Sequence, residues 1–143
     1  MTQADAGFDI GSLDSVVETT FNVPVILDAD GNPKSGFVIS GKDSDGYRDA
    51  AHKIRVESLQ RASKRKALID TSTIEGAETM AKTIEANDLM LACSVVVGWF
   101  GFANGGAVAE FDAAVAKKML VKFPTWRNRV LEALENDANF TKG

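Results

Sequence analysis

An uncharged run from Leu89 to Ala103 constrains the fold more than any other stretch of this sequence. Crossing the hydrocarbon core of a bilayer as a helix takes about 20 apolar residues. This run is shorter, it contains Ser94, and Asp88 stands directly before it. We therefore expect the run to be buried in a globular core, and the sequence argues against a membrane span.

The bulk properties predict one folded domain in a reducing compartment. A chain of 143 residues, 45% hydrophobic and 25% charged, can bury a core without disulfides or a metal. The one cysteine, Cys93, lies inside the apolar run, and Met1 to Gly11 lacks the basic residues of a secretory signal. A net charge of −4 gives no general attraction to nucleic acid or to an anionic membrane.

Residues 20–42 are expected to form a β-hairpin. Apolar residues alternate with others from Phe21 to Leu27, and Pro24 suits an edge position in a sheet. The stretch from Asp28 to Gly36 is rich in turn formers and precedes a second short apolar run. Because two strands alone are marginal in water, the hairpin must pack against helices of its own chain or against a neighbouring subunit.

The pattern changes to a helical one after the hairpin. Asp43 or Ser44 can cap a helix that we expect to run to about Leu68. Ser72, followed three residues later by Glu75, matches a capping box and predicts the start of a second helix. Its apolar residues recur at helical spacing, so the uncharged run is expected to belong to this helix until Gly98; they are Ile74, Ala77, Ala81, Ile84, Leu91 and Val95.

Two shorter helices are expected near the C-terminus. The first spans roughly Asp112 to Lys122, and the second begins at Pro124, whose missing N–H costs nothing at a first helical position. The sequence thus predicts an α+β fold: one mainly helical domain of about four helices with a short N-terminal β-hairpin. We expect a flexible acidic leader at 1–19, the hairpin at 20–42 and the helical part of the same domain at 43–143.

No catalytic, cofactor or metal site is predicted. His52 has no cluster of cysteines or carboxylates at ligand spacing near it, and Cys93 has no local basic partner that would lower its pKa. The segment that begins at Asp28 starts like a calcium loop, but its glycine stands two positions early and Ile39 occupies the place of the bidentate Glu. A hairpin turn explains this segment better. The expectation is a protein that is not an enzyme and needs no cofactor.

Two groups of residues are candidate partner surfaces. An aromatic and apolar group near the C-terminus is either core or a binding groove, and the sequence alone does not separate these readings. Its members are Trp99, Phe100, Phe102, Phe123, Trp126, Val130 and Phe140. The second group is the basic residues of the first helix: Arg48, Lys53, Arg55, Arg61, Lys64, Arg65 and Lys66. Its charges spread around the helix without interleaved aromatics, which favours a solvated helix or an acidic partner over nucleic acid.

Several short motifs follow one another in a recognisable order. The first half has Asp28-Ala29-Asp30-Gly31-Asn32-Pro33, then Gly41-Lys42-Asp43-Ser44-Asp45 and Tyr47-Arg48. The second half has Val97-Gly98-Trp99-Phe100-Gly101, Gly105-Gly106, Phe111, Phe123-Pro124-Thr125-Trp126 and Ala138-Asn139-Phe140. Over roughly residues 25–140 this order resembles the tail assembly chaperones and related small tail-gene products of long-tailed bacteriophages.

The resemblance implies a non-catalytic factor in the cytoplasm of an infected host cell. Such a factor binds and solubilises the tape measure protein, helps recruit tail tube subunits and often self-associates, and it is absent from the finished virion. Two alternatives remain open from the residues: a structural virion protein of the tail or head-tail junction, and a small nucleic-acid-binding module acting through the basic helix 48–66. Presence in purified particles would favour the first alternative, and salt-sensitive binding to nucleic acid the second.

Overall fold

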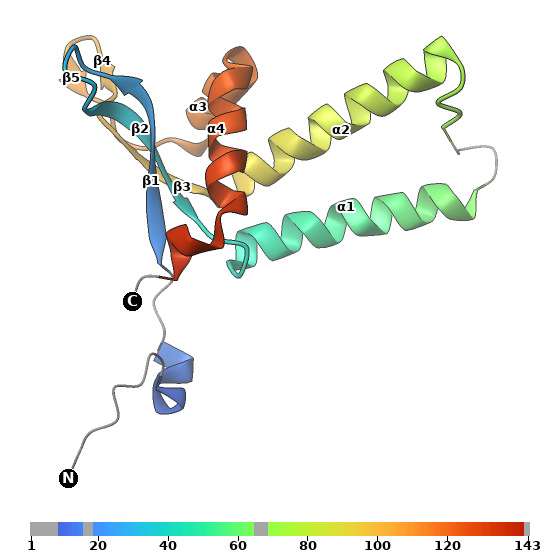
Figure 1. The fold of residues 1–143 in the computed structure, drawn as a ribbon, viewed down its shortest axis with the longest axis horizontal. Helices are drawn as coiled ribbons and strands as arrows, with labels where there is room; N and C mark the ends of the chain where they lie inside the picture. The colour runs from blue at the N-terminus through green and yellow to red at the C-terminus, as the bar shows by residue number, and fades with distance from the viewer. Residues whose placement is uncertain (1–8, 16–18, 65–68, 142–143) are drawn as a thin grey trace.

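The computed structural model describes residues 9–15, 19–64 and 69–141, and it shows an α+β domain (Figure 1). The domain is a small antiparallel sheet with helices packed against it, from which two long helices project as an arm. Its elements are η1 (Ile10–Ser15), β1 (Thr20–Leu27), β2 (Pro33–Ser40), α1 (Asp45–Ser63), α2 (Ile74–Val95), β3 (Val96–Phe100), β4 (Ala103–Asn104), β5 (Ala107–Val108), α3 (Ala113–Lys122), α4 (Pro124–Glu135) and η3 (Asp137–Phe140).

The predicted hairpin is confirmed, but it is part of a three-stranded sheet in the order β1-β2-β3. The central strand β2 pairs with both neighbours, so that Phe37 lies opposite Val23 on one side and Trp99 on the other. The prediction that the uncharged run stays helical until Gly98 is therefore wrong. The helix ends at Val95, and the β-branched and aromatic residues that follow it form the third strand.

The turn between β1 and β2 is built around a carboxylate. Oδ1 of Asp28 accepts hydrogen bonds from the backbone N–H groups of Asp30 and Asn32, both at 2.9 Å. Gly31 has φ +83°, a conformation that glycine adopts without steric cost. This geometry confirms that the segment is a hairpin turn.

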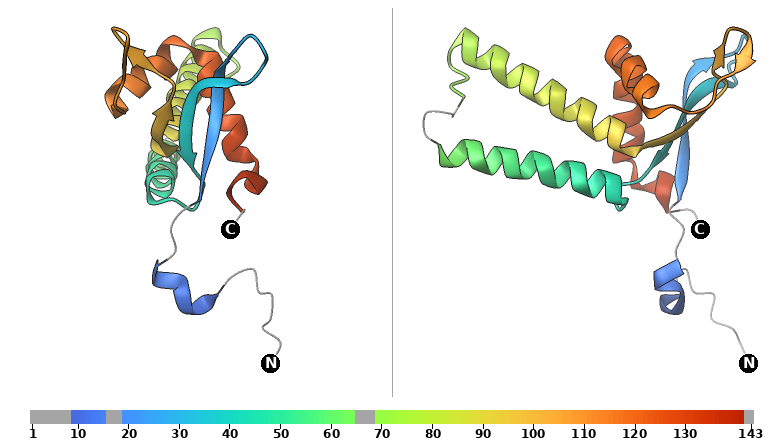
Figure 2. Two further views of the ribbon diagram at one scale, coloured as in Figure 1. Left: turned by 90° about the vertical axis from the view of Figure 1, so that its left-hand side faces the viewer. Right: turned by 180° about the vertical axis from the view of Figure 1, so that it is seen from behind.

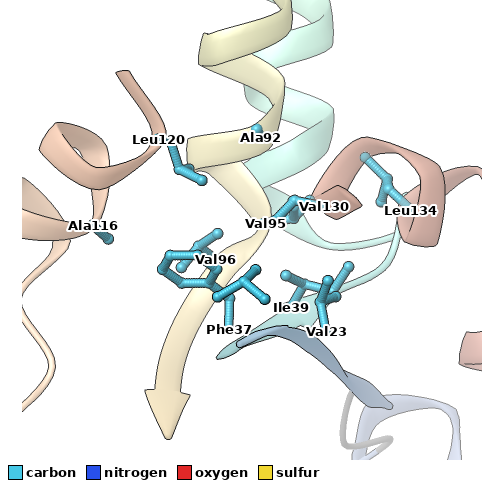
Figure 3. Close-up of a cluster of buried hydrophobic side chains, with 11 residues drawn as sticks. Val23, Phe37, Ile39, Ala92, Val95, Val96, Ala116, Leu120, Val130 and Leu134 are labelled. Atoms are coloured by element: carbon cyan, nitrogen blue, oxygen red, sulfur yellow. The ribbon is translucent and has the colours of Figure 1, made fainter. Parts of the chain in front are cut away.

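The hydrophobic core lies where the sheet meets α3, α4 and the C-terminal end of α2 (Figure 3). Phe37 and Ile39 of the central strand are fully buried, and Val95, Leu120 and Val130 approach them from three different helices. The other buried apolar residues of this core are Val23, Val25, Ala92, Val96, Ala116 and Leu134.

The arm consists of α1 and α2, which lie close together near the sheet and further apart at their far ends (Figures 1 and 2). Ser44 caps α1 by accepting from the N–H of Tyr47, as the sequence predicts. The helix ends at Ser63, not near Leu68, because Lys64 takes an extended conformation. The N–H of Lys64 donates to the carbonyl of Arg61, which stands three residues earlier in the chain. None of the residues of α1 is buried.

The start of α2 differs from the predicted capping box. Thr73, not Ser72, is the N-cap, and its hydroxyl accepts from the N–H of Gly76 at 3.0 Å. The hydroxyl and N–H of Ser72 instead donate to the carboxylate of Asp70 in the preceding turn. These two bonds lower the pKa of Asp70, because they stabilise its charged form.

The two C-terminal helices form as predicted. Asp112 caps α3 through bonds from the N–H groups of Ala114 and Val115, and Pro124 is the first residue of α4. At the chain end, Phe140 in η3 packs on Phe21 of β1 with ring centroids 6.3 Å apart. None of the helices in the described ranges is both long enough and apolar enough to span a bilayer.

Only part of the expected leader can be described. Residues 10–15 form the short 3-10 helix η1, in which Ile10 and Leu13 are exposed. Residues 1–8 and 16–18 of the predicted leader lie outside the described residues.

Candidate partner-binding groove

The aromatic residues singled out by the sequence mostly pack against one another. Trp99 and Phe102 contact edge to face, with centroids 5.5 Å apart, and Phe102 reaches Phe37 of the core at the same distance. Trp126 joins them from α4 and stacks on Phe123 at 4.2 Å. These rings form a connected cluster between the sheet and α4, so the space between them is filled.

The hydrogen-bonding group of Trp99 is also used inside the domain. Its indole N–H donates to the carbonyl of Ala109 at 2.9 Å, which ties β3 to the segment before α3. Phe100 and Phe140 are half-buried, and Val130 is fully buried. Phe123 keeps 38% of its surface exposed and is the member of the group most open to a partner.

The basic helix does not gather its charges on one side. Arg48 and Arg55 line a polar depression on one flank of α1, whereas Lys53 lines a groove on the other flank. Arg61 is half-buried and Lys64 exposed; Arg65 and Lys66 lie outside the described residues. Acidic residues are interspersed: Asp45, Asp49 and Glu57. The charges therefore provide no continuous basic stripe along the described helix.

A groove that sequence analysis missed lies where α1, α2 and α3 meet. Its volume is about 650 Å³. The apolar lining comes mainly from Leu89, Met90 and Cys93 of α2, which are half-buried. The remaining lining residues are Asp49, Ala50, Lys53, Ala86, Ser94 and Lys117. The arrangement is an apolar floor with a charged rim.

The electrostatics of the groove follow from its rim. Burial raises the pKa of the Cys93 thiol, and the positive charge of Lys117 offsets this effect only in part. The thiol is therefore neutral near pH 7 and acts as a small apolar group. Lys53 and Lys117 give the rim two cations against the one carboxylate of Asp49, which favours a ligand with acidic flanks.

The residues considered for metal or nucleophilic chemistry are dispersed. His52 is exposed on α1 beside Arg48 and Arg55, and Cys93 lies in the groove described above. Within residues 9–15, 19–64 and 69–141, no group of three or more His, Cys, Asp or Glu side chains could hold a metal ion.

Comparison of the chain with protein-family models, with curated proteins and with solved structures finds no match.

Proposed function

We propose that this chain is a non-catalytic assembly chaperone that binds apolar helical segments of a client protein. The observation that carries the proposal is the groove between α1, α2 and α3, with Leu89, Met90 and Cys93 on its floor. An amphipathic helix inserts apolar side chains into such a groove at helical spacing, and a methionine adapts to varied shapes. The rim lysines favour clients whose apolar stripe is flanked by Asp or Glu.

In this proposal, the client protein is inferred from the resemblance to tail assembly chaperones of long-tailed bacteriophages. The client is the tape measure protein, a long and largely helical chain, and the complex helps recruit tail tube subunits. The site of action is the cytoplasm of the infected host. A protein that binds many helical segments in turn needs an adaptable apolar surface, and the groove supplies one.

The test is co-expression with the tape measure protein encoded beside its gene, followed by pull-down and a comparison of client solubility. Ala86→Glu introduces a carboxylate into the groove at an exposed position, and we expect at least a tenfold loss of client capture. Ala81→Glu makes the same change on the same helix outside the groove lining and is the matched control, with capture unchanged.

Cys93 offers an independent readout of groove occupancy. Because its thiol lines the groove, a bound client helix slows alkylation of Cys93 by a thiol reagent. Absence of both a complex and a gain in solubility would overturn the proposal. The protein would then be sought in purified particles, as expected for a structural tail or connector protein.

A further inference from the structure

The arm carries an apolar stripe on α2 that the chain covers along only half of its length. Stepping along the helix at about 100° per residue places Ile74, Ala77, Ala81 and Ile84 on one side. All four are exposed, with Ile74 at 82% and Ile84 at 53%. The same side continues through the half-buried Asp88 into Ala92 and Val95, which are fully buried in the core. The exposed half is therefore a continuation of a core-forming face.

The uncovered stripe lies away from the groove proposed to bind a client. The groove is lined on α2 by Ala86, Leu89, Met90, Cys93 and Ser94, none of which belongs to the stripe. At the end nearer the sheet, Glu85 approaches Arg127 of α4, with Oε1 and Nη1 3.8 Å apart. The free part of the stripe thus runs from this contact to the far end of the arm.

The first helix of the arm, α1, also presents exposed side chains on the flank opposite the groove. Arg48, His52, Arg55 and Leu59 follow one another at helical spacing, and the first three line the depression on the flank of α1 opposite the groove. Leu59 is 64% exposed. Helices α1 and α2 diverge toward their far ends (Figure 2), and Leu59, Ile74 and Ile84 are exposed in this part of the arm.

The two helices have net charges of opposite sign, which favours a second copy of this chain as the partner that covers the stripe. Helix α1 carries four Lys and Arg against three Asp and Glu, whereas α2 carries one Lys against four Asp and Glu. In a two-fold arrangement, residue i of one copy meets residue j of the other and the reverse. The basic helix of each arm would then face the acidic helix of its partner, and both apolar stripes would be covered.

We propose that the arm docks on the arm of a second copy of this chain. The interface consists of Leu59 and the stripe Ile74, Ala77, Ala81 and Ile84, with Arg55 facing Glu78 of the other copy. The resulting assembly joins four helices, which is the usual way for helical hairpins to cover one exposed apolar side. The inference is independent of the client-binding proposal, because it uses the other side of the arm.

The test is the mass of the full chain in solution, measured by light scattering and sedimentation over a wide concentration range. We expect a dimer whose dissociation constant rises at least about 100-fold in Ala81→Glu, which places a carboxylate in the apolar interface. Ala86→Glu is the matched control and stays dimeric. The two variants thus separate the two proposals, because each is expected to affect only one of the two interactions.

Exchanging the charges of Arg55 and Glu78 separates an effect on the interface from an effect on folding, because only a direct contact is restored by the two changes together. Arg55→Glu and Glu78→Lys, each alone, are expected to weaken the dimer several-fold, and the two changes together to restore it. Circular dichroism checks that each variant keeps its helices. A wild-type chain that stays monomeric, an Ala81→Glu dimer of undiminished affinity, or a double variant weaker than both single variants would overturn the inference.

Discussion

Phe37 occupies the central position in the core of this protein. It lies on the middle strand, and it is the largest of the fully buried side chains. Its ring contacts Phe102 and Trp126, so it connects the aliphatic core to the aromatic cluster. Removing this ring would take away contacts on both sides at once.

Phe37→Ala is therefore expected to lower the free energy of unfolding by about 3–5 kcal/mol, the usual cost of deleting a fully buried aromatic ring. Urea unfolding followed by circular dichroism measures this change. Val108→Ala is the control, because Val108 is 90% exposed and its truncation should alter stability by less than about 0.5 kcal/mol. Equal effects of the two substitutions would contradict the assignment of the core.

At the residue level, the sequence predicted little of the candidate groove: of the partner-surface residues that it singled out, Lys53 lines the groove. It identified Trp99 and Trp126 as either core or interface, and the structure shows both packed among other rings. It did not point to Leu89 or Met90, because an apolar residue on a long helix has the same pattern whether it lines a groove or fills a core. Only the position of α3 over α2 distinguishes the two cases, and this position depends on long-range packing.

At the level of elements, local signals located the helices well. Ser44, Asp112 and Pro124 each mark a helix start where the sequence predicts one. Strand β3 was missed because Val96 and Val97 continue the apolar run of α2 without a glycine or proline between them. Tertiary pairing with β2 overrides the helical tendency there, and no local residue marks the change.

The cap of α2 provides a sharp test at this scale. Thr73→Ala removes the hydroxyl that accepts from the N–H of Gly76, and we expect it to cost about 1 kcal/mol of helix stability. Ser72→Ala leaves this bond intact and removes only exposed bonds to Asp70, so its cost should be smaller. Thermal unfolding of both variants measures the difference. A larger loss for Ser72→Ala would show that the helix begins one residue earlier.

At the level of the whole molecule, stability is distributed unevenly between the sheet region and the arm. The buried residues gather where the sheet meets α3, α4 and the end of α2, and α1 contributes none of them. Helices with few buried contacts open locally at lower free energy than core strands do. In an isolated chain, the arm would therefore be less protected than the sheet region, and covering it would stabilise α1 and the first half of α2 together.

Amide hydrogen exchange can measure this division. We expect amides of β2 and α4 to be the most protected, and those of α1 and of α2 from Ile74 to Ile84 to exchange at least tenfold faster. Because a second copy would cover the arm, its protection should rise with protein concentration while that of β2 stays constant. In Ala81→Glu the arm should exchange rapidly at every concentration, whereas Ala86→Glu should behave like the wild type. Concentration-independent protection of the arm would mean that its stability comes from contacts within one chain.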